Sequence, residues 1–85
     1  MRMHGTTMVS VGKLRQMIAE GKRVVIYTRC IACGEIGRYE QYTSDPTIFA
    51  LWHIGDGKRC AYLELNITLD RVLQSVRSPI SIDEL

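Results

Sequence analysis

The stretch that decides the fold is TIFALWHIGDGKRCAYLELN, residues 47–66. Two apolar runs flank the dipeptide Asp56-Gly57, which is favoured at the central positions of a type I′ β-turn. The pattern therefore predicts a β-hairpin with a two-residue turn. In that hairpin His53 pairs with Cys60, so both side chains point to the same face of the sheet.

Both faces of this hairpin are apolar, and only one can be the main core face. Side chains alternate along a strand, so the pairing sorts them into two sets. The first set is the predicted core face: Ile48, Ala50, Trp52, Ile54, Ala61, Leu63 and Leu65. The opposite set is still too apolar to be fully solvated: Phe49, Leu51, His53, Cys60, Tyr62 and Glu64.

The segments before the hairpin predict a helix and two strands. Ser10 can cap a helix over 10–20, and Gly21 supplies its left-handed end. The β-branched run over 23–30 predicts a central strand that is covered on both faces. Residues 36–43 predict a further strand, and their polar content indicates an exposed or edge position.

After the hairpin, Thr68 can cap a second helix over 68–77, which Pro79 ends. The C-terminal tail, 79–85, alternates isoleucines with polar residues, so it is either a short edge strand or a frayed end. The N-terminal segment, 1–8, is expected to be flexible.

Together these elements predict one small α+β domain over residues 1–85. An antiparallel β-meander of three to four strands is flanked by an N-terminal and a C-terminal helix, in the order α-β-β-β-β-α, with both helices on one face. The predicted core consists of Val11, Leu14, Ile18, Val24, Ile26, Ile48, Ala50, Trp52, Leu63, Leu65, Leu69, Val72, Leu73 and Val76.

Composition limits the functions that the chain can have. Hydrophobic residues make up 46% and charged residues 24%, an ordinary globular mixture. A formal charge of +2 permits a nucleic-acid partner without requiring one. No apolar run could span a bilayer and the N-terminus lacks a signal-peptide core, so we expect a cytoplasmic protein without a membrane partner. Disulfides are disfavoured in that compartment.

The motif CIACG, which begins at Cys30, is the one stretch that could carry chemistry. Cys30 ends the predicted strand 23–30 and Cys33 follows the turn, which is the spacing of a zinc knuckle, and Gly34 can take the positive φ that the turn needs. The predicted hairpin supplies two further ligands. The sequence therefore predicts a structural Zn²⁺ site of the Cys₃His type, made of Cys30, Cys33, His53 and Cys60.

Two other interpretations of the motif stay open. The second half of the site, H-x₆-C, is irregular for a zinc ribbon, so the cysteines could be small apolar side chains in or near turns. A redox pair is the other interpretation, although residues 34–43 lack the helical pattern that lowers a thioredoxin-like thiol pKa. A Cys60–His53 pair has no third orienting group, so we expect no enzyme activity.

Basic residues near the two predicted turns are the candidate partner-binding residues: Arg29, Arg38, Lys58 and Arg59. The small size and the incomplete catalytic set favour a binding protein that inhibits or regulates a protein partner by occluding its surface. Such regulatory proteins are frequent in phages and mobile elements. The alternative is a zinc-ribbon-like nucleic-acid-binding module, in which the basic residues contact phosphates.

Overall fold

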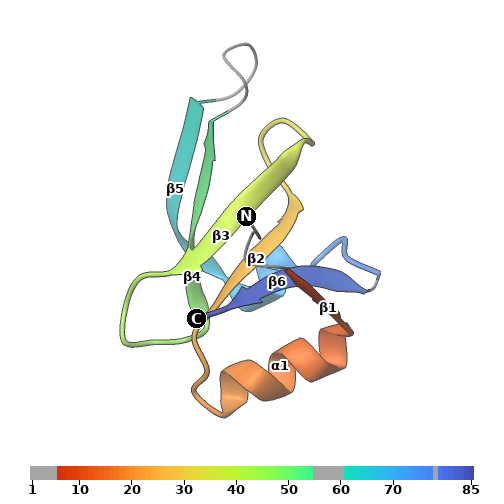
Figure 1. Cartoon of the computed structure of the whole chain (residues 1–85). Coiled ribbons are helices and arrows are strands. Elements are labelled where there is room, and N and C mark those ends of the chain that lie inside the picture. Colours follow the sequence, from red (N-terminus) through yellow and green to blue (C-terminus); the bar gives the residue numbers. More distant parts are fainter. Residues whose placement is uncertain (1–5, 55–60, 78) are drawn as a thin grey trace, which may run out of the picture.

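The computed structural model describes residues 6–54, 61–77 and 79–85. The elements within them are β1 Thr7–Val9, α1 Val11–Ala19, β2 Val24–Arg29, β3 Ile36–Gln41, β4 Ile48–Ile54, β5 Ala61–Thr68, α2 Leu69–Val72 and β6 Ile80–Glu84. The strands form one sheet in the order β1-β6-β2-β3-β4-β5, and every neighbouring pair is antiparallel. Figure 1 shows α1 at one end of this twisted sheet and the β4–β5 hairpin extending from the other.

The fold is α+β, as predicted, but the strand number and the place of the helices differ. The predicted central strand, β2, does lie inside the sheet, between β6 and β3. Of the two positions predicted for the strand over 36–43, the edge is wrong, because β3 pairs with β2 and β4, whereas Ile36 and Arg38 on one face of β3 are exposed. The tail forms β6, an inner strand whose Ile80 and Ile82 are buried. The helices are therefore not the first and last elements of the chain, since β1 precedes α1 and β6 follows α2.

Both helices begin at their predicted caps. The hydroxyl of Ser10 caps α1, and Gly21, with a φ of 85°, follows its end. The hydroxyl of Thr68 caps α2, which is a single turn rather than the predicted helix over 68–77. Leu73 ends α2, and the chain then crosses to β6. No helix in the described part of the chain is long and apolar enough to cross a membrane.

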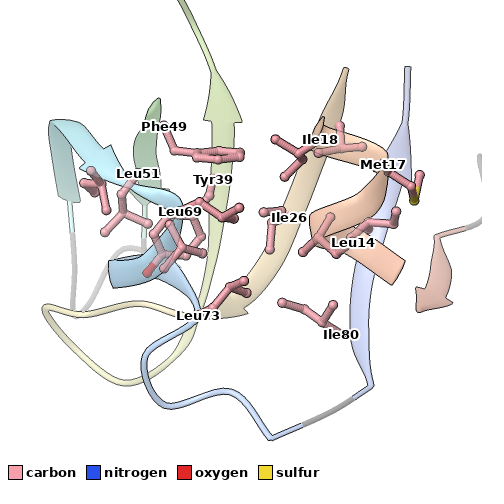
Figure 2. Close-up of a cluster of buried hydrophobic side chains, with 14 of the residues drawn as sticks. Leu14, Met17, Ile18, Ile26, Tyr39, Phe49, Leu51, Leu69, Leu73 and Ile80 are labelled. Carbon is pink, nitrogen blue, oxygen red and sulfur yellow. The ribbon is translucent and has the colours of Figure 1, made fainter. Parts of the chain in front are cut away.

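The register across the sheet decides which side chains form the core. Cross-strand neighbours form one row on the inner face, a residue per strand from β6 to β5: Ile82, Ile26, Tyr39, Leu51 and Glu64. The first four of these are buried. The helices cover this face, and their contributions to the same core cluster are Leu14, Met17, Ile18, Leu69, Val72 and Leu73 (Figure 2).

The core face predicted for the hairpin is wrong. Arg38, Trp52 and Leu63 are neighbours in the next row, which points outward. Trp52 is 47% exposed, Leu63 52% and Leu65 49%, whereas Phe49 and Leu51 are fully buried. The predicted core residues that are buried are Leu14, Ile18, Val24, Ile26, Ala50, Leu69, Val72 and Leu73. Those packed against the core or partly buried are Val11, Val76 and Ile48.

The hairpin register also differs from the prediction. His53 pairs with Tyr62 instead of Cys60, a shift of two residues that keeps the same side chains on each face. The structure pairs Ile54 with Ala61, which a two-residue turn would not allow. The Asp56-Gly57 dipeptide itself lies outside the described residues.

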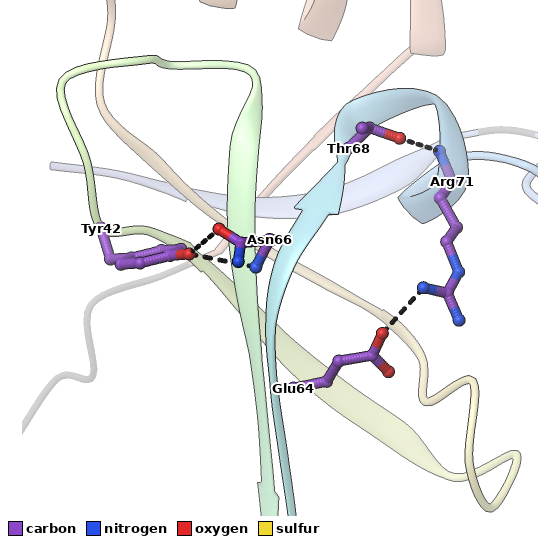
Figure 3. A network of polar contacts seen from close by, with 5 residues as sticks. All are labelled: Tyr42, Glu64, Asn66, Thr68 and Arg71. Atoms are coloured by element: carbon purple, nitrogen blue, oxygen red, sulfur yellow. Dashed lines mark hydrogen bonds and ion pairs between the residues drawn. The ribbon is translucent and has the colours of Figure 1, made fainter.

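A β-bulge turns Ile67 inward. Between the partners of Phe49 and Leu51, β5 contains one extra residue, which allows Ile67 to join the core. Asn66 has a φ of 62°, a left-handed conformation that asparagine adopts more readily than most residues. The Tyr42 hydroxyl donates to the Asn66 side chain and accepts from its backbone amide at 3.1 Å, which holds the bulge in place (Figure 3).

Candidate metal centre

The turn that follows β2 closes on itself through backbone hydrogen bonds. The Cys30 amide donates to the Glu35 carbonyl at 2.5 Å, and the Gly34 amide donates to the Cys30 carbonyl at 2.9 Å. Gly34 has a φ of 83°, the positive value that the sequence predicts. The Ala32 amide points at the Cys30 sulfur, 3.4 Å away. The turn thus carries Cys33 back toward Cys30.

Two residues of β3 support this turn. A Cβ atom on Gly37 would lie 2.7 Å from a methyl of Leu51 and 3.3 Å from Cys30, so the close approach of turn and sheet requires glycine. The buried Tyr39 donates its hydroxyl hydrogen to the Arg29 carbonyl at 2.7 Å. Burial is the main reason why the pKa of Tyr39 is raised to about 12, and negative charge at Cys30 adds to the effect.

His53 reaches the turn from the inner face of β4, two residues beyond Leu51. Its Nδ1 lies 3.4 Å from the Sγ of Cys33, and the ligand atoms of Cys30, Cys33 and His53 all lie within 4.8 Å of one another. Around a tetrahedral Zn²⁺, sulfur and nitrogen ligands are about 3.6 Å apart and two sulfurs about 3.8 Å apart. The three side chains therefore lie close to the separations that a shared zinc ion requires.

The surroundings of Cys30 favour its metal-binding form. Burial is the largest single influence and raises its pKa, but hydrogen bonds from His53 and from the Ala32 and Cys33 amides act together in the other direction. The net result is a pKa lowered from 9.0 to about 7. A lowered pKa favours the thiolate, which is the form that binds metals.

The structure brings together three of the four predicted ligands. Cys30 is buried, and Cys33 and His53 are half-buried beside it. Cys60 lies outside the described residues. The supporting roles of Gly37 and Tyr39 were not predicted from the sequence. A glycine within a strand is a known sign of close backbone approach, so Gly37 was detectable from the pattern.

The described basic residues of the predicted partner-binding set lie in different surroundings. Arg29 ends β2 and donates to the Gly34 carbonyl at 3.3 Å, beside the candidate metal centre. Arg38 lies on the outer face of β3 and forms an ion pair with Glu40 at 2.5 Å. Lys58 and Arg59 lie outside the described residues.

Comparison with known proteins found no relative of this chain. No protein-family model, no curated protein and no solved structure matches the chain.

Proposed function

We propose that the chain is a small non-enzymatic binding domain whose fold is stabilised by one Zn²⁺ ion held by Cys30, Cys33 and His53. The observation that carries the proposal is the convergence of these three side chains, with all ligand atoms within 4.8 Å. Two thiolates and an imidazole are a donor set that suits zinc better than magnesium or calcium, which prefer oxygen. No disulfide joins the two described cysteines, so both thiols can become metal ligands.

The ion would contribute to stability because it ties β4 to the turn after β2. Cys33 and His53 are 20 residues apart in sequence, and the unfolded chain has no preformed site, so metal-binding energy becomes folding energy. A domain of this size has a small core and depends on such a cross-link. Cys60 remains the fourth ligand proposed from the sequence.

Metal analysis with matched variants tests the zinc proposal. Wild-type protein purified without a metal-affinity tag is expected to contain about one equivalent of Zn²⁺, and chelation should lower its melting temperature. Cys33→Ser should lose the metal and melt as the chelated wild type does. Ala32→Ser, which changes an exposed neighbour and no ligand, is the control. Zinc far below one equivalent, with Cys33→Ser melting like the wild type, would contradict the proposal.

Cobalt substitution examines the ligand set more closely. Co²⁺ bound by thiolates absorbs through sulfur-to-metal charge transfer, and the intensity grows with the number of thiolates. Cys33→Ser should weaken this band. A comparable loss in Cys60→Ser would support the fourth ligand, whereas an unchanged band in that variant would remove Cys60 from the site.

For the partner, the proposal is a protein that the domain inhibits or regulates by surface occlusion, as in phage and mobile-element regulators. The outer patch, defined as Tyr42, Ala50, Trp52, Leu63 and Leu65, supports a protein partner. Four of its members are more than two-fifths exposed, although apolar side chains of this size are usually buried. The two charges beside it, Arg38 and Glu40, pair with each other, so the patch suits an apolar partner surface.

Capture from the source cells tests the partner proposal. Trp52→Ser should remove a protein that co-purifies with the wild type, because aromatic anchors such as tryptophan dominate many interfaces. Leu63→Thr should reduce the amount captured, because it removes apolar contact area beside Trp52. Lys13→Gln, an exposed change on α1, should retain it. An oligonucleotide assay covers the alternative of a nucleic-acid-binding module, which requires binding that weakens by about 0.7–0.9 log units per log unit of salt for each phosphate contact.

A further inference from the structure

A cavity of about 640 Å³ lies beside the candidate metal centre and away from the outer patch. One wall is the turn after β2, and the other is the segment that leads from α2 to β6. Figure 2 shows these two segments looping out at the same end of the sheet, near Leu73 and Ile80. The residues that line the cavity are Thr28, Arg29, Cys30, Ile31, Gly34, Ile36, Arg71, Val72, Gln74, Ser75, Val76, Arg77 and Pro79.

The lining is basic and rich in hydrogen-bond donors. It contains Arg29, Arg71 and Arg77, and none of the lining residues is acidic. Glu64 balances part of this charge, because it forms an ion pair with Arg71 at 2.8 Å (Figure 3). Arg77 is exposed and forms no ion pair with a described residue. The positive charge that remains attracts an anion.

The same cavity has an apolar side. Ile31 and Ile36 are 40% and 64% exposed, and they line it together with Val76 and Pro79. Ligand cavities of about 300–1,000 Å³ accommodate organic molecules, so this one exceeds the needs of a bare ion. Its occupant would therefore combine an anionic group with a flat or apolar body.

We propose that this cavity binds a nucleotide-sized organic phosphate monoester, with its phosphate at Arg29 and Arg77 and its organic body against the isoleucines. A phosphate offers two negative charges and three oxygens, which satisfy the donor forks of two guanidinium groups better than one carboxylate does. Thr28 and Ser75, one from each side of the cavity, have hydroxyl groups that can provide further donors. Adenosine monophosphate is a suitable probe of this chemistry.

Titration of the isotope-labelled full chain, followed by amide NMR shifts, tests the proposal. Adenosine monophosphate should give saturable shifts at Gly34, Ser75 and Val76. Adenosine, which lacks the phosphate, should bind at least about tenfold more weakly, since charge-assisted hydrogen bonds to guanidinium are lost. Inorganic phosphate should shift the same amides with lower affinity, because it makes no contact with the apolar wall.

Matched arginine variants locate the phosphate. Arg77→Gln should lower the affinity for adenosine monophosphate about tenfold. The variant should fold normally because Arg77 is exposed. Arg23→Gln is the control, since Arg23 precedes β2 and lies roughly 20 Å from Arg29 at the other end of that strand. Below the melting temperature of the metal-free protein, the metal-free and zinc-loaded forms should both bind the probe, so failure of the zinc site and failure of this cavity give different results.

Three outcomes would overturn the proposal. The first is the absence of saturable shifts up to roughly 10 mM adenosine monophosphate, since a dissociation constant above that concentration would be too weak for a specific site. The second is equal weakening by Arg77→Gln and Arg23→Gln. The third is tight binding of a single-stranded oligonucleotide with a salt slope well beyond the value of about 0.7 expected for one phosphate, which would identify a nucleic-acid strand as the ligand.

Discussion

The two faces of β4 carry similar side chains into opposite surroundings. Phe49 and Leu51 are fully buried, whereas the adjacent Trp52 is 47% exposed. Hydrophobicity does not separate these faces; pairing with the neighbouring strands does. Ile26 of β2 points into the core, Tyr39 is its partner on β3, and Leu51 is the partner of Tyr39 on β4. The inner strands thus determine which face of the hairpin is buried.

Truncating one aromatic side chain on each face of β4 should give the largest difference in unfolding free energy between the two faces. Phe49→Ala removes a fully buried ring and should cost about 3–5 kcal/mol of unfolding free energy, through lost transfer energy and a cavity. Trp52→Ala should cost about 1 kcal/mol or less, because its ring is already half in water. Urea unfolding followed by circular dichroism measures both.

A milder variant keeps this contrast measurable if Phe49→Ala does not fold. Phe49→Leu should fold and still be less stable than Trp52→Leu. Trp52 is the only tryptophan, so its fluorescence provides an independent check. We expect the emission of a solvated indole with ready quenching by acrylamide, and blue-shifted, unquenched emission would contradict the outer placement.

Gly37→Ala tests how closely the metal-site turn packs against the inner face. The new methyl would lie 2.7 Å from a methyl of Leu51, which is fully buried and has little room to move. Overpacking of this kind should cost about 1–3 kcal/mol. It should also weaken zinc binding, because the same methyl would press on Cys30, 3.3 Å away.

Gly12→Ala is the matched control, since no atom lies within 4 Å of a Cβ at that helical position. It should stabilise the protein by about 0.5–1 kcal/mol, because alanine loses less backbone entropy than glycine in a helix. If both alanine variants behave alike, the close contact between turn and sheet is absent.

Local signals in the sequence predicted the helix starts, the glycine turns and the central strand. Ser10 and Thr68 cap the helices, Gly21 and Gly34 have positive φ, and β2 is central. These features depend on single residues and their immediate neighbours. Three of the four proposed metal ligands also converge, because the C-x-x-C turn and an inward-facing histidine need little long-range information.

Long-range pairing was harder to predict. Both faces of β4 are apolar, so the sequence of β4 does not show which face is buried. The pairing of β4 with β3, and of β3 with β2, determines which alternate residues point inward. One clue was present: Phe49 and Leu51 share a face with His53, so placing the histidine at the cysteine turn already implies that these two point inward. The inner position of β6 depends on pairing with two strands distant in sequence, which no local pattern shows.

Tyr39→Phe isolates one polar contact of the inner face. Losing the hydrogen bond to the Arg29 carbonyl should cost about 1 kcal/mol at pH 8. The fold holds the phenol in its neutral form, with a pKa raised to about 12 from 10.0. The stability that this contributes is complete below pH 10 and is lost as the pH rises through 12.

The difference between wild type and Tyr39→Phe should therefore shrink as the pH rises from 10 to 12. Urea unfolding of both proteins at pH 8 and pH 11 measures it, and the comparison cancels the effect of titrating lysines. Tyr27→Phe, a half-buried tyrosine without a described hydrogen-bond partner for its hydroxyl, is the control. A constant difference across this range would show that Tyr39 ionises as it does in the unfolded chain.

The smallest expected effect comes from Leu63→Thr on the outer face of β5. Leu63 is 52% exposed and threonine has a high strand propensity, so the change should be within about 0.5 kcal/mol. On the same strand Ile67 is fully buried, and Ile67→Thr should cost about 2 kcal/mol or more, because it places a hydroxyl in the core. Equal costs for these two would show that the bulge at Asn66 does not separate the faces. A stable Leu63→Thr protein that also binds less of a hydrophobic dye would identify the outer patch as a surface available for binding rather than part of the core.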